Sequence, residues 1–202
     1  MQLSIVAKTL GLLLMVFSLA QVPPVLVDLI YSEGEYLTFV FSFILTVFGG
    51  LVLWWPFRAI KKSFRLREGV LIVVSFWIVL SLFGTLPFLI TESISNLSFS
   101  NAFFESMSGL TTTGATVLSQ LDELPKSILF YRQQLQWLGG MGIIVLAVAV
   151  LPLLGVGGME LYHAESSGIA KDRLTPKLRN TAIALWKIYL SLTVLCALAY
   201  FF

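Results

Sequence analysis

The stretch "SGLTTTGATVL", Ser108 to Leu118, decides how this chain folds. It is uncharged, rich in threonine and turn-prone, yet it stands between long apolar segments of the kind that form membrane helices. Backbone that is not helical is tolerated at membrane depth only where protein buries it or water wets it. The stretch is therefore either an external loop that caps a helix or a polar segment held inside the membrane by surrounding protein.

The composition predicts a membrane protein. Of 202 residues, 57% are hydrophobic and only 12% are charged, and a soluble domain of this size could not hide so much apolar surface from water. The net charge of +2 gives no argument for a nucleic-acid partner. The single cysteine, Cys196, excludes a disulfide framework or a cysteine-based metal site, and we expect no cofactor. Lys8 lies inside the first apolar run without a small-residue cleavage pattern, so we expect no cleaved signal peptide.

Five stretches are long enough to cross a bilayer, which takes about 20 apolar residues. They are residues 3–30, 37–55, 69–90, 129–154 and 181–202. Pro23 and Pro24 should kink the first, because proline removes a helix donor and clashes with the preceding turn. The predicted fold class is an all-α membrane protein with about five transmembrane helices.

The charged loops predict the orientation. A basic segment, "RAIKKSFRLRE" at 58–68, follows the second span, and a second basic cluster occupies 171–179. Positive loops stay cytoplasmic, so the N-terminus is expected inside and the acidic loop "DLIYSEGEY" at 28–36 outside. Five crossings place both basic clusters inside provided that residues 91–128 begin and end outside.

The segment 91–128 is best explained by a re-entrant hairpin. "FSNAFFESMSGL" at 99–110 has the length of a half-helix, too short and too polar to cross, and residues 122–134 read as loop-like. We therefore expect a short re-entrant pore helix that descends from outside, followed by a polar filter loop that returns. A plain external loop satisfies the same count of crossings and stays an alternative.

An uncharged returning strand suits a monovalent cation. Its carbonyls and hydroxyls can replace the hydration shell of the ion without trapping it as a carboxylate would, and the C-terminal dipole of the preceding helix also favours a cation. The predicted cation-binding residues are Thr112, Thr113, Gly114 and Ala115, with K⁺ at Thr112 and Thr113, and the predicted filter-support residues are Thr111, Thr116 and Glu105. Glu105 is expected to brace the strand rather than to touch the ion, because direct coordination would slow ion exit.

The chain resembles a known transporter family in two adjacent stretches. "NAFFESMSGLTTTGATVL" at 101–118, followed by "RQQLQWLGGMGIIVLAVAVLPLLGVGG" at 132–158, is similar to the Trk/Ktr superfamily of potassium transporters, in particular the membrane subunit of the bacterial Trk uptake system. The resemblance implies four non-identical repeats of helix, pore loop and helix around one potassium path. It also implies a multi-pass protein of the bacterial inner membrane, surrounded by lipid, that forms a homodimer with a cytosolic nucleotide-binding regulatory subunit.

The resemblance divides the chain into three parts. Residues 1–68 match two accessory transmembrane helices and a basic cytoplasmic loop, and residues 69–156 match the first repeat. Residues 157–202 match a cytoplasmic linker and the first helix of a second repeat. Since only one of four filter strands is found, we expect an N-terminal part of a longer protein or a shortened gene product. The glycines of "LGGMG" at 138–142 are expected to let helices approach closely rather than to form a gating hinge.

The sequence thus predicts potassium transport and no enzymatic activity. Intramembrane catalysis needs convergent nucleophiles, acids or metal ligands, and the scattered glutamate, cysteine and histidine do not supply them. Two alternatives stay open, a non-conducting truncated subunit and a homotetrameric cation channel.

Overall fold

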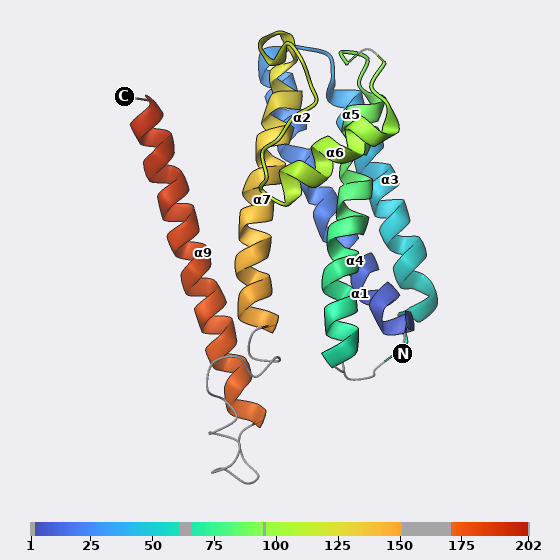
Figure 1. Ribbon diagram of the computed structural model, residues 1–202, viewed down its shortest axis with the longest axis vertical. Coiled ribbons are helices and arrows are strands. Elements are labelled where there is room, and N and C mark those ends of the chain that lie inside the picture. Colours follow the sequence, from blue (N-terminus) through green and yellow to red (C-terminus); the bar gives the residue numbers. More distant parts are fainter. Residues whose placement is uncertain (1–2, 61–65, 95, 151–170, 202) are drawn as a thin grey trace. The chain divides into compact units, whose positions relative to one another are not determined.

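The structure, a computed structural model, describes residues 3–60, 66–94, 96–150 and 171–201. All regular elements in these ranges are helices, which confirms the all-α prediction. In chain order they are α1 (Leu3–Ser18), η1 (Leu19–Gln21), α2 (Val22–Tyr31), α3 (Tyr36–Trp54), η2 (Trp55–Phe57), α4 (Leu66–Gly84), α5 (Leu86–Ile90), α6 (Phe99–Leu110), η3 (Leu121–Glu123), α7 (Lys126–Val150) and α9 (Lys171–Phe201) (Figure 1). They form two compact units, residues 1–140 and 141–202.

Four of the five predicted membrane spans are present in the described part of the chain. The helical segments long and apolar enough to cross a membrane are Leu3–Tyr31, Tyr36–Phe57, Gly69–Ile90 and Asn180–Phe201. The fourth predicted span, 129–154, begins within α7, but residues 151–154 lie outside the described residues, as do residues 157–170 of the predicted linker. The second unit contains α9, which starts at Lys171, ten residues before the predicted span.

Prolines interrupt two of the spans. The first span is interrupted at the place where a kink is predicted, because the chain passes through the 3-10 turn η1 directly before Pro23 and Pro24 in the first turn of α2. A second interruption, between α4 and α5 at Thr85, was not predicted. Pro87 lies in the first turn of α5, where its missing N–H costs no helical hydrogen bond.

The prediction that residues 122–134 are loop-like holds for 122–125 and is wrong from Lys126 onward. After the short turn η3 the chain is helical from Lys126 onward. The first backbone N–H groups of a helix have no partner within it. In α7 the carboxylate of Glu33 is their partner, since it accepts hydrogen bonds from the N–H of Lys126 at 2.8 Å and from that of Ser127 at 3.1 Å. A partner 93 residues away in the chain thus starts α7 where the local sequence gives no clear helix signal.

Carboxylates tie three connections together at one end of the first unit, which we call the acidic end (residues 28–36, 91–94, 96–98 and 119–127). Asp28 accepts from the N–H groups of Glu35 and Tyr36 at 2.8 and 2.9 Å, and so caps α3. Glu35 in turn accepts from the hydroxyls of Thr91, at 2.8 Å, and Ser93. The sequence had suggested these acidic residues only as a marker of orientation.

At the opposite end of this unit, Lys8 joins the first half of α1 to the residues that follow η2. Its ammonium donates to the carbonyls of Arg58 at 2.9 Å and Ile60 at 2.7 Å. The acidic loop and the start of the basic loop therefore lie at opposite ends of the unit, as the predicted succession of crossings requires.

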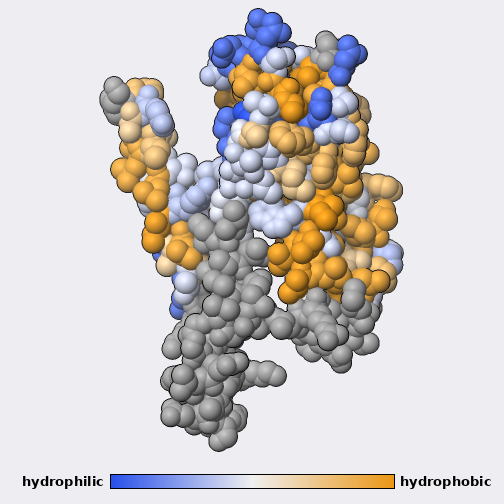
Figure 2. All heavy atoms as spheres, viewed as in Figure 1, coloured by the Kyte–Doolittle hydropathy of each residue, from blue (hydrophilic) through white to orange (hydrophobic). Residues whose placement is uncertain are grey.

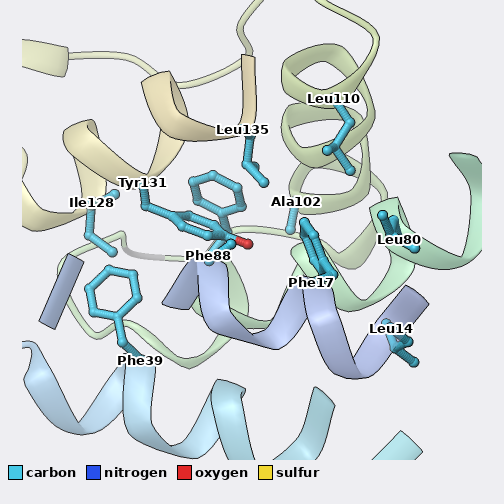
Figure 3. Packing of buried hydrophobic residues seen from close by; sticks show 11 residues of the cluster. Leu14, Phe17, Phe39, Leu80, Phe88, Ala102, Leu110, Ile128, Tyr131 and Leu135 are labelled. Atoms are coloured by element: carbon cyan, nitrogen blue, oxygen red, sulfur yellow. The ribbon is translucent and has the colours of Figure 1, made fainter. Parts of the chain in front are cut away.

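Aromatic packing holds α3, α5 and α7 together in the core of the first unit. The ring of Tyr131 lies 5.7 Å from that of Phe39 and 5.4 Å from that of Phe88, and its hydroxyl donates to the carbonyl of Gly84 at 3.0 Å. Ala102 of α6 is fully buried in the same cluster (Figure 3). The short helix α6 is thereby fixed against several longer ones.

Part of the surface of the first unit is apolar. Figure 2 shows hydrophobic residues along the right-hand flank of this unit, weakly hydrophilic residues to the left of that flank, and the most hydrophilic residues at the acidic end. Large exposed side chains such as Phe41, Ile44 and Phe48 of α3 contribute to this surface. Contiguous apolar surface of this kind suits lipid rather than water.

Candidate functional site

The predicted half-helix 99–110 is confirmed as α6, and the polar stretch follows it. Ser98 caps α6 by accepting from the N–H of Asn101 at 3.2 Å. Figure 1 shows α6 running inward from the acidic end and the chain after it returning to that end. A hollow of about 390 Å³ is lined by residues from 93–101 and from 117–124, so both ends of this hairpin lie side by side.

The tip of the hairpin lies deep within the helical unit. A Cβ added to Gly139 of α7 would overlap the carbonyl of Leu110, the last residue of α6, and one added to Gly109 would lie 3.0 Å from Leu135 Cβ. Gly139 is thirteen residues from the start of α7, which is about 20 Å along a helix axis. The small residue thus permits a close approach, as expected for "LGGMG".

Two left-handed residues shape the turn after α6. Thr112 has φ of +58° and Gly114 has φ of +75°. This conformation is easy for glycine but unusual for a β-branched residue such as Thr112. The N–H groups of Thr112 and Thr113 stay satisfied, bonded to the carbonyls of Gly109 and Ser108, each at 2.9 Å. Strained backbone that its surroundings hold in place is frequent at functional sites.

The structure brings the four predicted cation-binding residues together on one exposed strand, but only two of their carbonyls accept hydrogen bonds. The carbonyl of Ala115 accepts from Ser108 Oγ at 2.7 Å, and that of Gly114 accepts from Arg132 Nη2 at 3.4 Å. Within the described ranges, no hydrogen bond reaches the carbonyls of Thr112 and Thr113. These two oxygens are the ones left for a ligand.

The hydroxyls of Thr111 and Thr113 form a small hydrogen-bond network with the last turn of α6. Thr111 Oγ1 donates to the carbonyl of Met107 at 2.8 Å. Because a hydroxyl has a single proton, Thr113 is the donor in the 2.8 Å bond between Thr111 Oγ1 and Thr113 Oγ1. Thr111 therefore links the strand to the last turn of α6.

Glu105 connects α6 to the far end of the strand. Its side chain is 1% exposed, and Oε1 accepts from Thr116 Oγ1 at 2.5 Å and from the N–H of Val117 at 2.6 Å. A charged acceptor makes such hydrogen bonds strong. The contacts support the bracing role suggested for Glu105, which stays a prediction.

Arg132 is the site residue that sequence reasoning missed. Its Nε donates to Glu105 Oε2 at 3.0 Å, and its side chain is 9% exposed. Residues 122–134 are predicted as loop-like, although 129–134 also belong to the predicted span 129–154, and a loop residue suggests no partner on α6. A signal existed, since Arg132 is the only charged residue in the predicted span 129–154 and Glu105 is the only one in 99–110. Lone charges in neighbouring membrane segments commonly pair.

These features define a class of protein, an all-helical membrane protein in which a short, half-buried helix is followed by an uncharged polar strand. A family model described as "TrkH: Cation transport protein" matches residues 36–202. The chain belongs to this TrkH family, which comprises transport proteins and not enzymes. In the described part of the chain no three acidic, histidine or cysteine residues are grouped to hold a metal ion.

Curated relatives and a crystal structure match nearly the whole chain. The Trk system potassium uptake protein TrkH of Halomonas elongata is 55% identical over 99% of this chain and 42% of the relative. The protein TrkG of the Trk system of Escherichia coli is 42% identical over 97% of the chain and 40% of the relative. The crystal structure of the potassium transporter TrkH from Vibrio parahaemolyticus gives a TM-score of 0.81 at 51% identity, over 100% of this chain and 40% of the other. The chain thus spans about two fifths of the length of these relatives.

Proposed function

We propose that this chain supplies one pore repeat of a potassium transporter, with K⁺ bound at Thr112 and Thr113 of the strand Thr112 to Ala115. The observation that carries the proposal is that Thr112 and Thr113 are exposed residues whose carbonyls accept no hydrogen bond in the described structure. The names of the relatives, which are potassium uptake proteins, support potassium as the ion.

The chemistry of the strand fits a permeating ion. Neutral carbonyl oxygens can replace part of the hydration shell of K⁺ and still release it, whereas a carboxylate would bind more tightly. Glu105, the nearby carboxylate, is occupied by Thr116, Val117 and Arg132 and so acts as a support. Thr111 and Thr116 support the two ends of the strand in the same way.

The proposal extends to the organisation of the chain. Residues 69–156 form the first helix, pore-loop and helix repeat, residues 1–68 form two accessory transmembrane helices with a basic loop, and residues 157–202 form a linker and the first helix of a second repeat. The depth of the hairpin tip beside Gly139 supports a re-entrant loop. One strand supplies one side of an ion site, so three further strands are needed from outside this chain.

The same proposal covers location and partners. We propose that the protein lies in the bacterial inner membrane with its N-terminus in the cytoplasm, because the start of the basic loop, at Arg58 and Ile60, lies at the end opposite the acidic loop. The intact protein is proposed to form a homodimer and to bind a cytosolic nucleotide-binding regulatory subunit. Lipid covers the apolar sides.

A chimera tests the proposed function. In it, residues 1–202 replace the matching 40% of TrkH from Vibrio parahaemolyticus, whose remainder supplies the other strands. We expect vesicles that contain the chimera to take up rubidium, a potassium substitute, and to exclude sodium. A chimera that reaches the membrane in normal amounts but moves no rubidium would show that this chain does not supply a working pore repeat.

A further inference from the structure

Arg132 touches both the carboxylate of α6 and the polar strand. Its Nε lies 3.0 Å from Glu105 Oε2, and its Nη2 lies 3.4 Å from the carbonyl oxygen of Gly114. A guanidinium presents several N–H groups in one rigid plane, so one side chain can hold two acceptors in a fixed relation. The position of Gly114 is thereby coupled to that of Glu105.

The contact with Arg132 sets the direction of a carbonyl. A carbonyl that accepts from Arg132 on α7 points into the protein rather than toward the exposed side of the strand. Ser108 acts in the same way on the next carbonyl, that of Ala115, at 2.7 Å. The strand is therefore divided, with the oxygens of Thr112 and Thr113 available and those of Gly114 and Ala115 engaged.

Charge gives Arg132 a second effect on the same strand. A lone buried guanidinium beside the strand would repel a cation, and a lone buried carboxylate would hold it too strongly. Both side chains are nearly inaccessible, with 9% and 1% of their surface exposed, so water screens neither. At a separation of 3.0 Å the two charges largely cancel, and the strand acts on the ion through its neutral oxygens.

We propose that Arg132 is a specificity-determining positioning residue of this repeat, which turns the Gly114 carbonyl away from the ion path and neutralises Glu105. This inference rests on the proposed function, because it assumes that the strand lines a cation path. It adds that the repeat offers only the carbonyls of Thr112 and Thr113, while Gly114 serves the turn.

The test measures rubidium and sodium uptake by variants of the chimera at equal abundance in the membrane. Arg132→Gln removes the fork and the charge, and we expect it to lower the rubidium-to-sodium uptake ratio about tenfold, the effect of losing one hydrogen bond to a charged group. Arg132→Lys keeps the charge but cannot hold both acceptors, so it should retain the uptake rate and lose part of the selectivity. Lys126→Gln, an exposed cation at the start of the same helix that contacts Tyr31, is the matched control and should resemble the parent.

A double variant separates positioning from charge and from simple loss of folding. Arg132→Gln alone leaves a lone buried carboxylate, which should hold the ion and lower the maximal rate of rubidium uptake. Glu105→Gln with Arg132→Gln restores charge balance, so this rate should rise again while the rubidium-to-sodium ratio stays low. If the double variant regains full selectivity, or if all Arg132 variants keep the parental ratio, the inference is overturned. A parent chimera without rubidium uptake would instead overturn the proposed function.

Discussion

The carbonyl of Leu110 lies against the backbone of Gly139, so close that a Cβ on Gly139 would overlap it. This contact joins the end of α6 to α7 directly below the turn at Thr112. The position of the strand therefore depends on a residue that carries no polar group and lies outside the strand.

We expect Gly139→Ala to destabilise the protein by about 1–3 kcal/mol, the usual cost of overpacking a buried site. The added methyl group must push the last turn of α6 away from α7. Thermal unfolding of the purified protein in detergent measures the effect. Gly69→Ala in α4 is the control, since nothing lies within 4 Å of its Cβ position. Equal melting temperatures for both variants would contradict the close contact.

Gly114→Ser should weaken the discrimination between potassium and sodium and leave membrane insertion intact. A Cβ at this position meets only Gln136 Oε1, at 3.9 Å, so space is not the obstacle. The obstacle is the φ of +75°, a conformation that costs a residue with a side chain about 1–2 kcal/mol. The strand is expected to relax and to misdirect its carbonyls. The ratio of rubidium to sodium uptake by the chimera measures this effect, and an unchanged ratio would show that the strand does not line the path.

Labelling of single cysteines tests the orientation. In a Cys196→Ser background, cysteine at exposed Ser32 of the acidic end should react with an impermeant thiol reagent from outside the cell. Cysteine at exposed Ala59 beyond η2 should react only after the cytoplasmic side is opened. This expectation rests on the basic loop, because positively charged loops stay cytoplasmic. The reverse pattern of labelling would invert the whole topology.

The sequence predicted the helices well because apolar length and proline position are local properties. The limits of the first two spans and of the half-helix 99–110 follow from the local run of residues and do not depend on a distant contact. The start of α7 was missed because it depends on Glu33, which reaches Lys126 only after the chain has folded.

The residue types of the candidate site can be predicted from the sequence, and their geometry cannot. An uncharged polar stretch between apolar segments predicts residues 111–116, and Glu105 is predicted as a support because direct coordination by its carboxylate would slow ion exit. Which carbonyls remain available depends on Ser108 and Arg132, which lie before and after the strand. Such a division arises from tertiary contacts, so no spacing in the sequence encodes it.

The last prediction concerns the 202-residue chain by itself. A dehydrated potassium ion needs a ring of oxygens, and this chain offers the Thr112 and Thr113 carbonyls from one side only. Four copies could supply a ring, but the helices of residues 3–57 in every copy would then have to fit around a fourfold axis. The resemblance instead implies a pore of four non-identical repeats, which has no such requirement.

We therefore expect the purified chain to insert into liposomes without potassium-selective rubidium flux, and the chimera to restore that flux. Insertion is checked by the cysteine labelling described above, so that a silent chain is not mistaken for an absent one. Robust selective uptake by the chain alone would favour a homotetrameric channel, whereas flux absent from both would favour a subunit that does not conduct.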